Sequence, residues 1–126
     1  MKRICIGLVI LSVLLGFALL AAIYMEQIHT PIANSLLQAA QNALDGDWDK
    51  AEVLTSNAFA SWQRHKRLTA ALEDHAPIEE MDGLFADLQL QLQQRQEVSF
   101  AVTCNRLAQL ATDITEDHAL TWWNLL

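Results

Sequence analysis

The run ICIGLVILSVLLGFALLAAIY, from Ile4 to Tyr24, holds 21 residues without a single charge and directly follows Lys2 and Arg3. At a rise of about 1.5 Å per residue, a helix of this length extends roughly 30 Å, which is the thickness of the hydrocarbon core of a bilayer. A helix that is apolar on all sides for so long is rare in the core of a soluble protein. The run therefore predicts a membrane-spanning helix.

Cleavage of this segment as a secretory signal is the main alternative to a permanent anchor. Signal peptides have an apolar core of about 7 to 15 residues, followed by small residues at the cleavage site. This run is longer, and leucine stands where the second small residue would precede a site near Ala21 or Ala22. We expect an uncleaved anchor, with cleavage left open. A lipoprotein does not fit, because Cys5 lies at the start of the run.

The charges on either side of the run predict its orientation. Basic residues collect on the cytoplasmic side of a membrane helix, and here Lys2 and Arg3 precede the run, while Lys50 is the first basic residue after it. We therefore expect a single-pass protein of the cell membrane with a cytoplasmic amino terminus. The predicted division is a cytoplasmic tail at 1–3, a transmembrane helix at 4–24, an extracytoplasmic helical bundle at 25–119 and an apolar tail at 120–126.

The part of the chain beyond residue 24 is strongly acidic. It contains all 15 acidic residues and six of the eight basic ones, which leaves a net charge of −9 with histidine neutral. Nucleic acid and anionic lipid are both poor partners for such a surface. The two cysteines, Cys5 and Cys104, are expected on opposite sides of the membrane or within it, so they cannot pair in one chain, and Cys104 falls among apolar helix positions that favour a buried, inert thiol.

Apolar residues beyond the span recur at spacings of three and four, and the alternation typical of strands is missing, so the fold class is all-α. Thr30 and Pro31 predict a helix start, with the span ending or kinking near His29. The expected helices cover residues 31–44 and 48–74, a third begins at 78, and a fourth covers 98–117. A turn is expected near 91–97, between the third and the fourth. These helices predict an antiparallel bundle of three to four helices. The inward stripe of the second of these includes Trp62, His65 and Leu68.

Antiparallel neighbours would bring the end of the last helix back to the membrane. His75 and His118 each stand in a Glu-Asp-His-Ala tetrapeptide, and both would then lie at the membrane-proximal end with Trp122 and Trp123. Tryptophan is enriched at membrane interfaces, so these four residues are the candidate interaction surface. The tryptophan pair could instead pack on the bundle or bind a partner.

The same two histidines raise the question of a metal site, because imidazole and carboxylate groups are zinc ligands. The His-x-x-x-His and Glu-x-x-His spacings of bundle metalloproteins are missing, so we expect no metal and no cofactor. His65 is expected to be a hydrogen-bonded core residue and His29 a solvated hinge residue. A cluster of basic residues at Arg64, Lys66 and Arg67 is expected to form ion pairs within the chain.

The plan of residues 39–62, AAQNALDGDWDKAEVLTSNAFASW, comprises an Ala-rich helix, Gly46 to Trp48 at the corner and Trp62 further along. With the Glu-Asp-His before the third helix and the final Asn124 to Leu126, it resembles a family of short uncharacterised bacterial proteins that carry a domain of unknown function. The resemblance implies one amino-terminal transmembrane helix, an extracytoplasmic helical bundle and an origin chiefly in spore-forming Gram-positive bacteria. It brings no activity or binding residues.

No nucleophile elbow and no phosphate-binding glycine loop is present, so we do not expect an enzyme. The expected function is that of a non-enzymatic protein-interaction or envelope-assembly module with a membrane or envelope protein as partner. The alternative is a ligand- or cation-sensing bundle that acts through a partner membrane protein. The oligomeric state stays open, since the span has no small-residue dimer motif.

Overall fold

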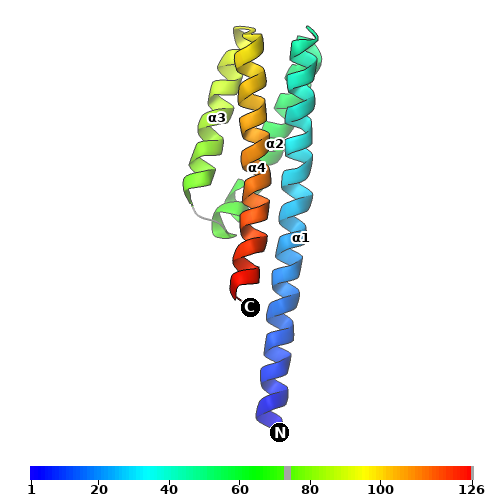
Figure 1. The fold of residues 1–126 in the computed structure, drawn as a ribbon, viewed down its shortest axis with the longest axis vertical. Helices are drawn as coiled ribbons and strands as arrows, with labels where there is room; N and C mark the ends of the chain where they lie inside the picture. Colours follow the sequence, from blue (N-terminus) through cyan, green and yellow to red (C-terminus); the bar gives the residue numbers. More distant parts are fainter. Residues whose placement is uncertain (73–74, 126) are drawn as a thin grey trace.

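The protein is all-helical in a computed structural model, which describes the backbone of residues 1–72 and 75–125 and the side chains of residues 1–71 and 76–114. Four helices follow one another: α1 (Lys2–Leu44), α2 (Trp48–Leu72), α3 (His75–Gln93) and α4 (Glu97–Leu125). They run alternately up and down, and α1 lies beside both α2 and α4, while α3 packs on the outer side of α4 (Figure 1). The predicted antiparallel bundle is confirmed.

The longest helix, α1, has 43 residues and extends about 65 Å at the standard rise. Residues 1–17 are exposed along their whole length, and this part of α1 projects beyond the other three helices (Figure 1). Buried positions gather from Met25 onward and continue at helical spacing through Ile32 and Leu36 to Ala43. One continuous helix thus joins a projecting apolar segment to the core of the bundle.

The predicted helix start at Thr30 and Pro31 is wrong, because α1 passes through Pro31 without interruption. A proline inside a helix loses one backbone hydrogen bond, at a cost of about 3 kcal/mol. The apolar stripe stays in register across this point, with Ile28 and Ile32 both buried on the same face. Burial of that stripe outweighs the lost hydrogen bond, and the exposed position of Pro31 leaves the freed carbonyl to water.

Two tight turns at the end of the bundle away from the amino terminus set the helix order. Gly46 adopts a left-handed conformation with φ 86°, and the Asp47 side chain accepts a hydrogen bond of 3.2 Å from the Lys50 amide at the start of α2. The turn between α3 and α4 places Arg95 at φ 50°. Both turns lie where the sequence predicts them.

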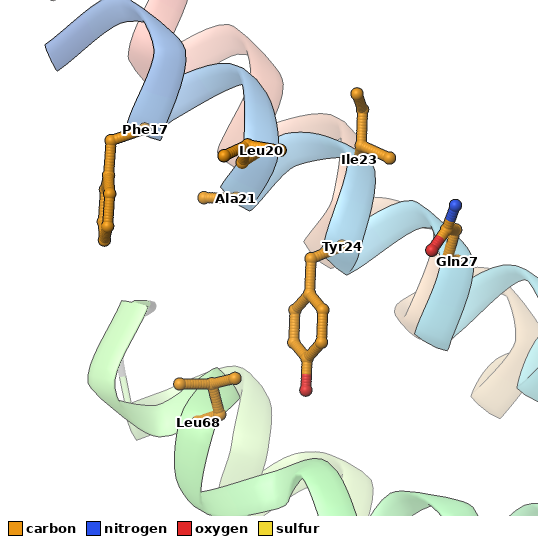
Figure 2. Close-up of a pocket in the computed structure, with 7 residues that line it drawn as sticks. All are labelled: Phe17, Leu20, Ala21, Ile23, Tyr24, Gln27 and Leu68. Carbon is orange, nitrogen blue, oxygen red and sulfur yellow. The ribbon is translucent and has the colours of Figure 1, made fainter. Parts of the chain in front are cut away.

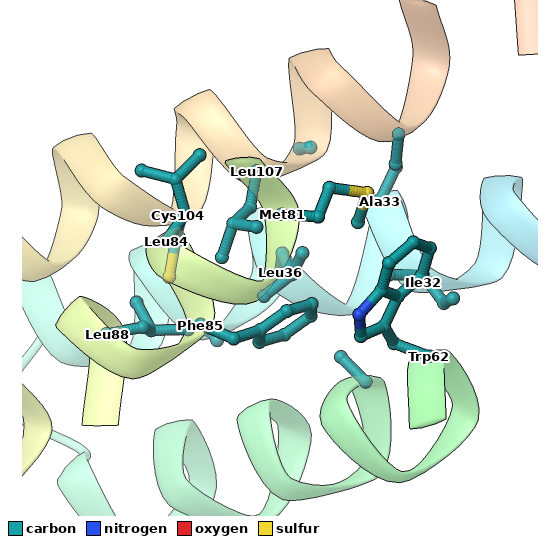
Figure 3. Close-up of a cluster of buried hydrophobic side chains, with 14 of the residues drawn as sticks. Ile32, Ala33, Leu36, Trp62, Met81, Leu84, Phe85, Leu88, Cys104 and Leu107 are labelled. Carbon is teal, nitrogen blue, oxygen red and sulfur yellow. The ribbon is translucent and has the colours of Figure 1, made fainter. Parts of the chain in front are cut away.

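The core is built from one apolar stripe of each helix. Trp62, which is fully buried, points from α2 toward α1 and α3, and Figure 3 shows its indole beside Ile32 and Met81. Small residues on α1, including Ala39 and Ala43, allow close approach of the neighbouring helices. The other large, fully buried members of the core are Met25, Leu36, Phe85, Leu88, Phe100, Cys104 and Leu107.

Residues 120–125 of the predicted apolar tail continue α4, which is helical as far as Leu125. The end of α4 lies beside α1 at the level where the projecting part of α1 begins (Figure 1). The α4 helix is about 43 Å long at the standard rise, so it reaches further along α1 than α2 and α3 do.

Candidate functional site

The four residues that the sequence proposes as an interaction surface occupy the end of the bundle from which α1 projects. His75 is the first residue of α3, and His118, Trp122 and Trp123 belong to the last turns of α4. The side chains of all four lie outside the described residues, so their mutual contacts are not part of the site described below. What the structure does describe at this end is a polar cluster and an apolar groove, both between α1 and α2.

The polar cluster starts at Tyr24, where α1 enters the bundle. Its hydroxyl lies 3.2 Å from Nδ1 of His65 on α2, and the two rings meet edge to face at a centroid distance of 6.1 Å. His65 is thus a partly buried, hydrogen-bonded histidine, as predicted. This contact ties the last residue of the predicted span to the second helix.

His29 lies one turn further along α1 and is only 1 % exposed, so its prediction as a solvated hinge residue is wrong. Because α1 does not break at Pro31, His29 stays on the inward face between Met25 and Ile32. Its Nδ1 group donates a hydrogen bond of 2.9 Å to the Met25 carbonyl, and its Nε2 atom is buried without a hydrogen-bond partner among the described residues.

The surroundings of His29 hold its imidazole in the neutral form. Burial lowers the pKa of His29 below the ordinary 6.5, the bond to Met25 opposes that shift, and the nearby His65 lowers the pKa further. The neutral tautomer with a proton on Nδ1 satisfies the Met25 carbonyl, whereas a second proton on Nε2 would be a buried donor with no acceptor.

Trp62 connects this cluster to α3. Its ring lies edge to face against His29 at 6.2 Å, and its Nε1–H donates a hydrogen bond of 2.8 Å to the Asp82 carboxylate. The other carboxylate oxygen of Asp82 forms an ion pair with the Lys66 ammonium group at a distance of 2.7 Å. Side chains from α1, α2 and α3 therefore form one connected arrangement that fixes the three helices relative to one another.

An apolar groove lies directly beside the Tyr24–His65 contact. It has a volume of about 560 Å³ and is lined by Phe17, Leu20, Ala21, Ile23, Tyr24, Gln27 and Leu68. Figure 2 shows Phe17 and Tyr24 pointing from α1 toward α2, with Leu68 on the opposite wall. Leu68 was predicted to face inward, yet 44 % of it is exposed, because the groove separates α1 and α2 at this level.

The basic residues beside the groove are only partly used in ion pairs. The ion pairs within the described part of the chain are Lys66 with Asp82 and, at 3.8 Å, Arg106 with Glu80. The expectation of ion pairing is met for Lys66, while Arg64 and Arg67 pair with none of the described carboxylates and are exposed. Two exposed cationic side chains of an acidic protein thus lie on α2 within about one helical turn of Leu68.

The described side chains offer few groups that are suited to catalysis or to metal binding. Cys104 is buried, and burial raises its pKa to about 12, so its thiol stays protonated and a poor nucleophile, as the sequence predicts. No group of three or more His, Cys, Asp or Glu residues that could hold a metal ion occurs within the described ranges. The arrangement is suited to binding an apolar or amphipathic partner.

Sequence reasoning identified His65 but missed the groove and the partners of His29. A helical stripe indicates which residues face inward, but it does not show where two helices separate. The exposed Leu68 at a core-type position is the signal that marks the groove, and it is visible only once α1 and α2 are placed side by side.

The fold and the site define a class: a small all-helical protein built on one long amino-terminal helix that has the length and composition to cross a membrane. Residues 19–125 match the model of the DUF4363 family, which is described as a domain of unknown function, and the chain belongs to that family. Searches of the curated proteins and of the solved structures found no match.

Proposed function

We propose that this protein is a single-span membrane-anchored module that presents an acidic helical bundle outside the cytoplasm for a non-enzymatic interaction or assembly role in the envelope. The bilayer would hold residues 4–24, with Met1 to Arg3 in the cytoplasm. The resemblance to short bacterial proteins implies a source among the spore-forming Gram-positive bacteria, and we include that source in the proposal. A membrane or envelope protein is the proposed partner.

The observation that carries the proposal is the continuity of α1. Its first 17 residues are apolar apart from Lys2, Arg3 and Ser12, and they are exposed on all sides. Such an apolar surface in water would strongly favour aggregation or a partner, whereas a bilayer covers it completely. The same helix then supplies the central stripe of the bundle core, so anchor and bundle form one rigid unit.

The support for an interaction role is the character of the bundle. Its buried apolar side chains pack in the core, the Tyr24–His65 and Trp62–Asp82 contacts join neighbouring helices, and its surface carries isolated exposed apolar residues such as Val53 and Val98. A rigid anchored bundle can hold a binding surface at a fixed distance from the membrane. That property serves assembly directly and needs no reacting group.

Membrane anchoring is tested first, on the full chain expressed in a bacterial host. Cell fractions are washed with alkaline carbonate, which removes peripheral proteins, and the intact mass of the retained chain is measured. We expect the chain in the washed membrane with residues 4–24 present. Recovery in the soluble fraction, or a mass that lacks the apolar segment, would contradict the anchor.

The interaction role is tested by placing a photoreactive residue at Val98 on α4 or at Val53 on α2, both more than half exposed. One discrete crosslinked membrane or envelope protein, captured from one of these faces and absent from the other, would support the proposal. The melting temperature of the full chain is measured with and without divalent metal ions in parallel. A metal-specific rise of several degrees without a crosslinked partner would favour the sensing alternative.

A further inference from the structure

We propose that the groove between α1 and α2 binds one acyl chain of an anionic phospholipid of the outer leaflet, with its phosphate held by Arg64 and Arg67. This inference rests on the proposed membrane anchor, because it needs the groove to open into a bilayer. It assigns a ligand class and a binding site to the end of the bundle from which α1 projects.

The first argument is the position of the groove on α1. Phe17, Leu20 and Ile23 line it and are themselves exposed, at 69, 67 and 43 %, which continues the exposed apolar surface of residues 1–17 along α1. The groove is thus continuous with the surface that a bilayer would cover. A lipid chain is the apolar molecule at highest concentration at that surface, so no separate delivery is needed.

The second argument is the shape and chemistry of the lining. A volume of about 560 Å³ falls within the range of ordinary ligand pockets, about 300–1,000 Å³. Its polar groups are Gln27 and the Tyr24 hydroxyl, and that hydroxyl already bonds to His65. The walls therefore suit a hydrocarbon chain, while Gln27 lies at the end further from the amino terminus of α1, where the lining turns polar.

The third argument is charge. Arg64 precedes Leu68 by four residues and therefore lies on the same face of α2, and Arg67 follows Arg64 by three residues, so the two arginines are neighbours on the helix surface at the edge of that face. Because α2 runs toward the projecting end of α1, Arg64 is placed further from the bilayer core than Leu68. A phosphate group lies above the acyl region in the same way. Neither arginine pairs with a described carboxylate, whereas Lys66 between them is already engaged by Asp82.

An anionic headgroup is preferred over a neutral one for an electrostatic reason. The bundle is acidic as a whole and would repel an anionic surface, so the two arginines form a local exception next to an apolar channel. Arginine binds phosphate in a two-pronged geometry and has a long apolar stem that can lie along the groove edge.

The experiment uses the full chain in phosphatidylcholine vesicles that contain a small fraction of phosphatidylglycerol with a photoreactive acyl chain. The same photoreactive chain on phosphatidylcholine is the comparison probe. After illumination, labelled residues are mapped by peptide mass spectrometry. We expect label at residues 17–27 and around Leu68, with the phosphatidylglycerol probe giving the stronger signal.

Two kinds of variant separate the headgroup from the chain. The exposed pair Arg64→Gln and Arg67→Gln is expected to lower groove labelling by phosphatidylglycerol by about tenfold, while Arg95→Gln in the distant turn is the matched control and should leave it unchanged. Ala21→Trp fills the groove and should abolish the label there, whereas Val13→Trp on the exposed part of α1 should not. If Ala21→Trp loses helicity, Leu68→Trp fills the groove from its other wall.

Several results would overturn the inference. Label spread evenly along the exposed part of α1, equal labelling by both probes, or no response to the arginine pair would each refute a specific anionic lipid site. A crosslinked dimer that protects the groove would assign it to a second copy of the chain. Failure of the membrane anchor itself is recognised separately, because the chain would then not remain with the vesicles.

Discussion

His29 is a buried histidine with one hydrogen-bonded ring nitrogen and one that has no partner among the described residues, and its burial makes the stability of the bundle depend on pH. Burial lowers its pKa in the folded state below 6.5, whereas the unfolded chain binds a proton at the ordinary value. The unfolded state therefore binds more protons as the pH falls through about 6.5, and the free energy of unfolding decreases from there downward. Above that pH, His29 is neutral in both states, and its burial no longer lowers the free energy of unfolding.

The variant His29→Leu should remove this dependence. We expect its urea midpoint to change little between about pH 7.5 and pH 5.5, while the midpoint of the unsubstituted chain falls over the same interval. The measurement is helical signal against urea at each pH for the full chain in mild detergent. An equal fall in both proteins would show that other groups cause the effect.

Loss of the Trp62–Asp82 hydrogen bond is expected to lower the free energy of unfolding. Asp82→Ala leaves the indole N–H of a fully buried tryptophan without an acceptor, which should lower the free energy of unfolding by about 1–3 kcal/mol. Lys66→Ala removes only a half-exposed ion pair with Asp82 and should cost less than about 1 kcal/mol. Similar losses in both variants would show that the ion pair, and not the indole bond, carries the stability.

For single residues, the sequence predicts burial where an apolar stripe continues without interruption, and it fails where a local helix-start signal or a groove intervenes. Cys104 falls on an apolar stripe and is buried, and His65 is hydrogen-bonded as expected. His29 was misplaced because its neighbours Thr30 and Pro31 have the chemistry of a helix start, although the stripe from Ile28 to Ile32 continues through them. Periodic burial over many residues outweighed a local signal.

Among the helices, α1 carries a proline in its interior that the bundle tolerates. Pro31→Ala restores the hydrogen bond to the Gln27 carbonyl and removes a poor helix former, so we expect the free energy of unfolding to rise by about 1–3 kcal/mol. The exposed Gln38→Ala is the matched control and should change it by less than about 0.5 kcal/mol. Urea unfolding of the full chain in detergent measures both.

A fall in stability for Pro31→Ala would have a clear meaning. It would show that α1 needs a local bend at Pro31 to bring the projecting segment and the bundle core into their observed relation. The proline would then determine the direction of α1, as the sequence-based expectation of a kink near His29 implies.

Glycine and proline mark the turn between α1 and α2 and the start of α3, although α3 begins at His75 and not at the predicted residue 78. Gly46 ends α1, and Pro77 falls in the first turn of α3, where its missing N–H has no partner to lose. The end of α4 was not predictable, since acidic residues and His118 at 116–118 are typical of a helix terminus and the helix nevertheless continues to Leu125. No glycine or proline stops it.

For the whole molecule, the order and direction of the helices followed from the sequence, because short turns between long helices make neighbours antiparallel. The groove could not be predicted from the sequence, because it depends on how far α1 and α2 separate near Leu68. That separation depends on long-range packing, including the Tyr24–His65 contact, whose members are 41 residues apart. Helical spacing within one element carries no such information.

The membrane orientation of the chain can be tested with single cysteines placed on either side of the span. Gln94 is exposed in the turn between α3 and α4, at the end of the bundle furthest from the amino terminus of α1. In intact cells, Gln94→Cys should react with a membrane-impermeant maleimide, because the basic residues that hold α1 in place lie before the span. Lys2→Cys should react only after the membrane is opened, and the unsubstituted chain gives the background of Cys5 and the buried Cys104. The reverse pattern would place the acidic bundle in the cytoplasm and would also move the proposed lipid site to the inner leaflet.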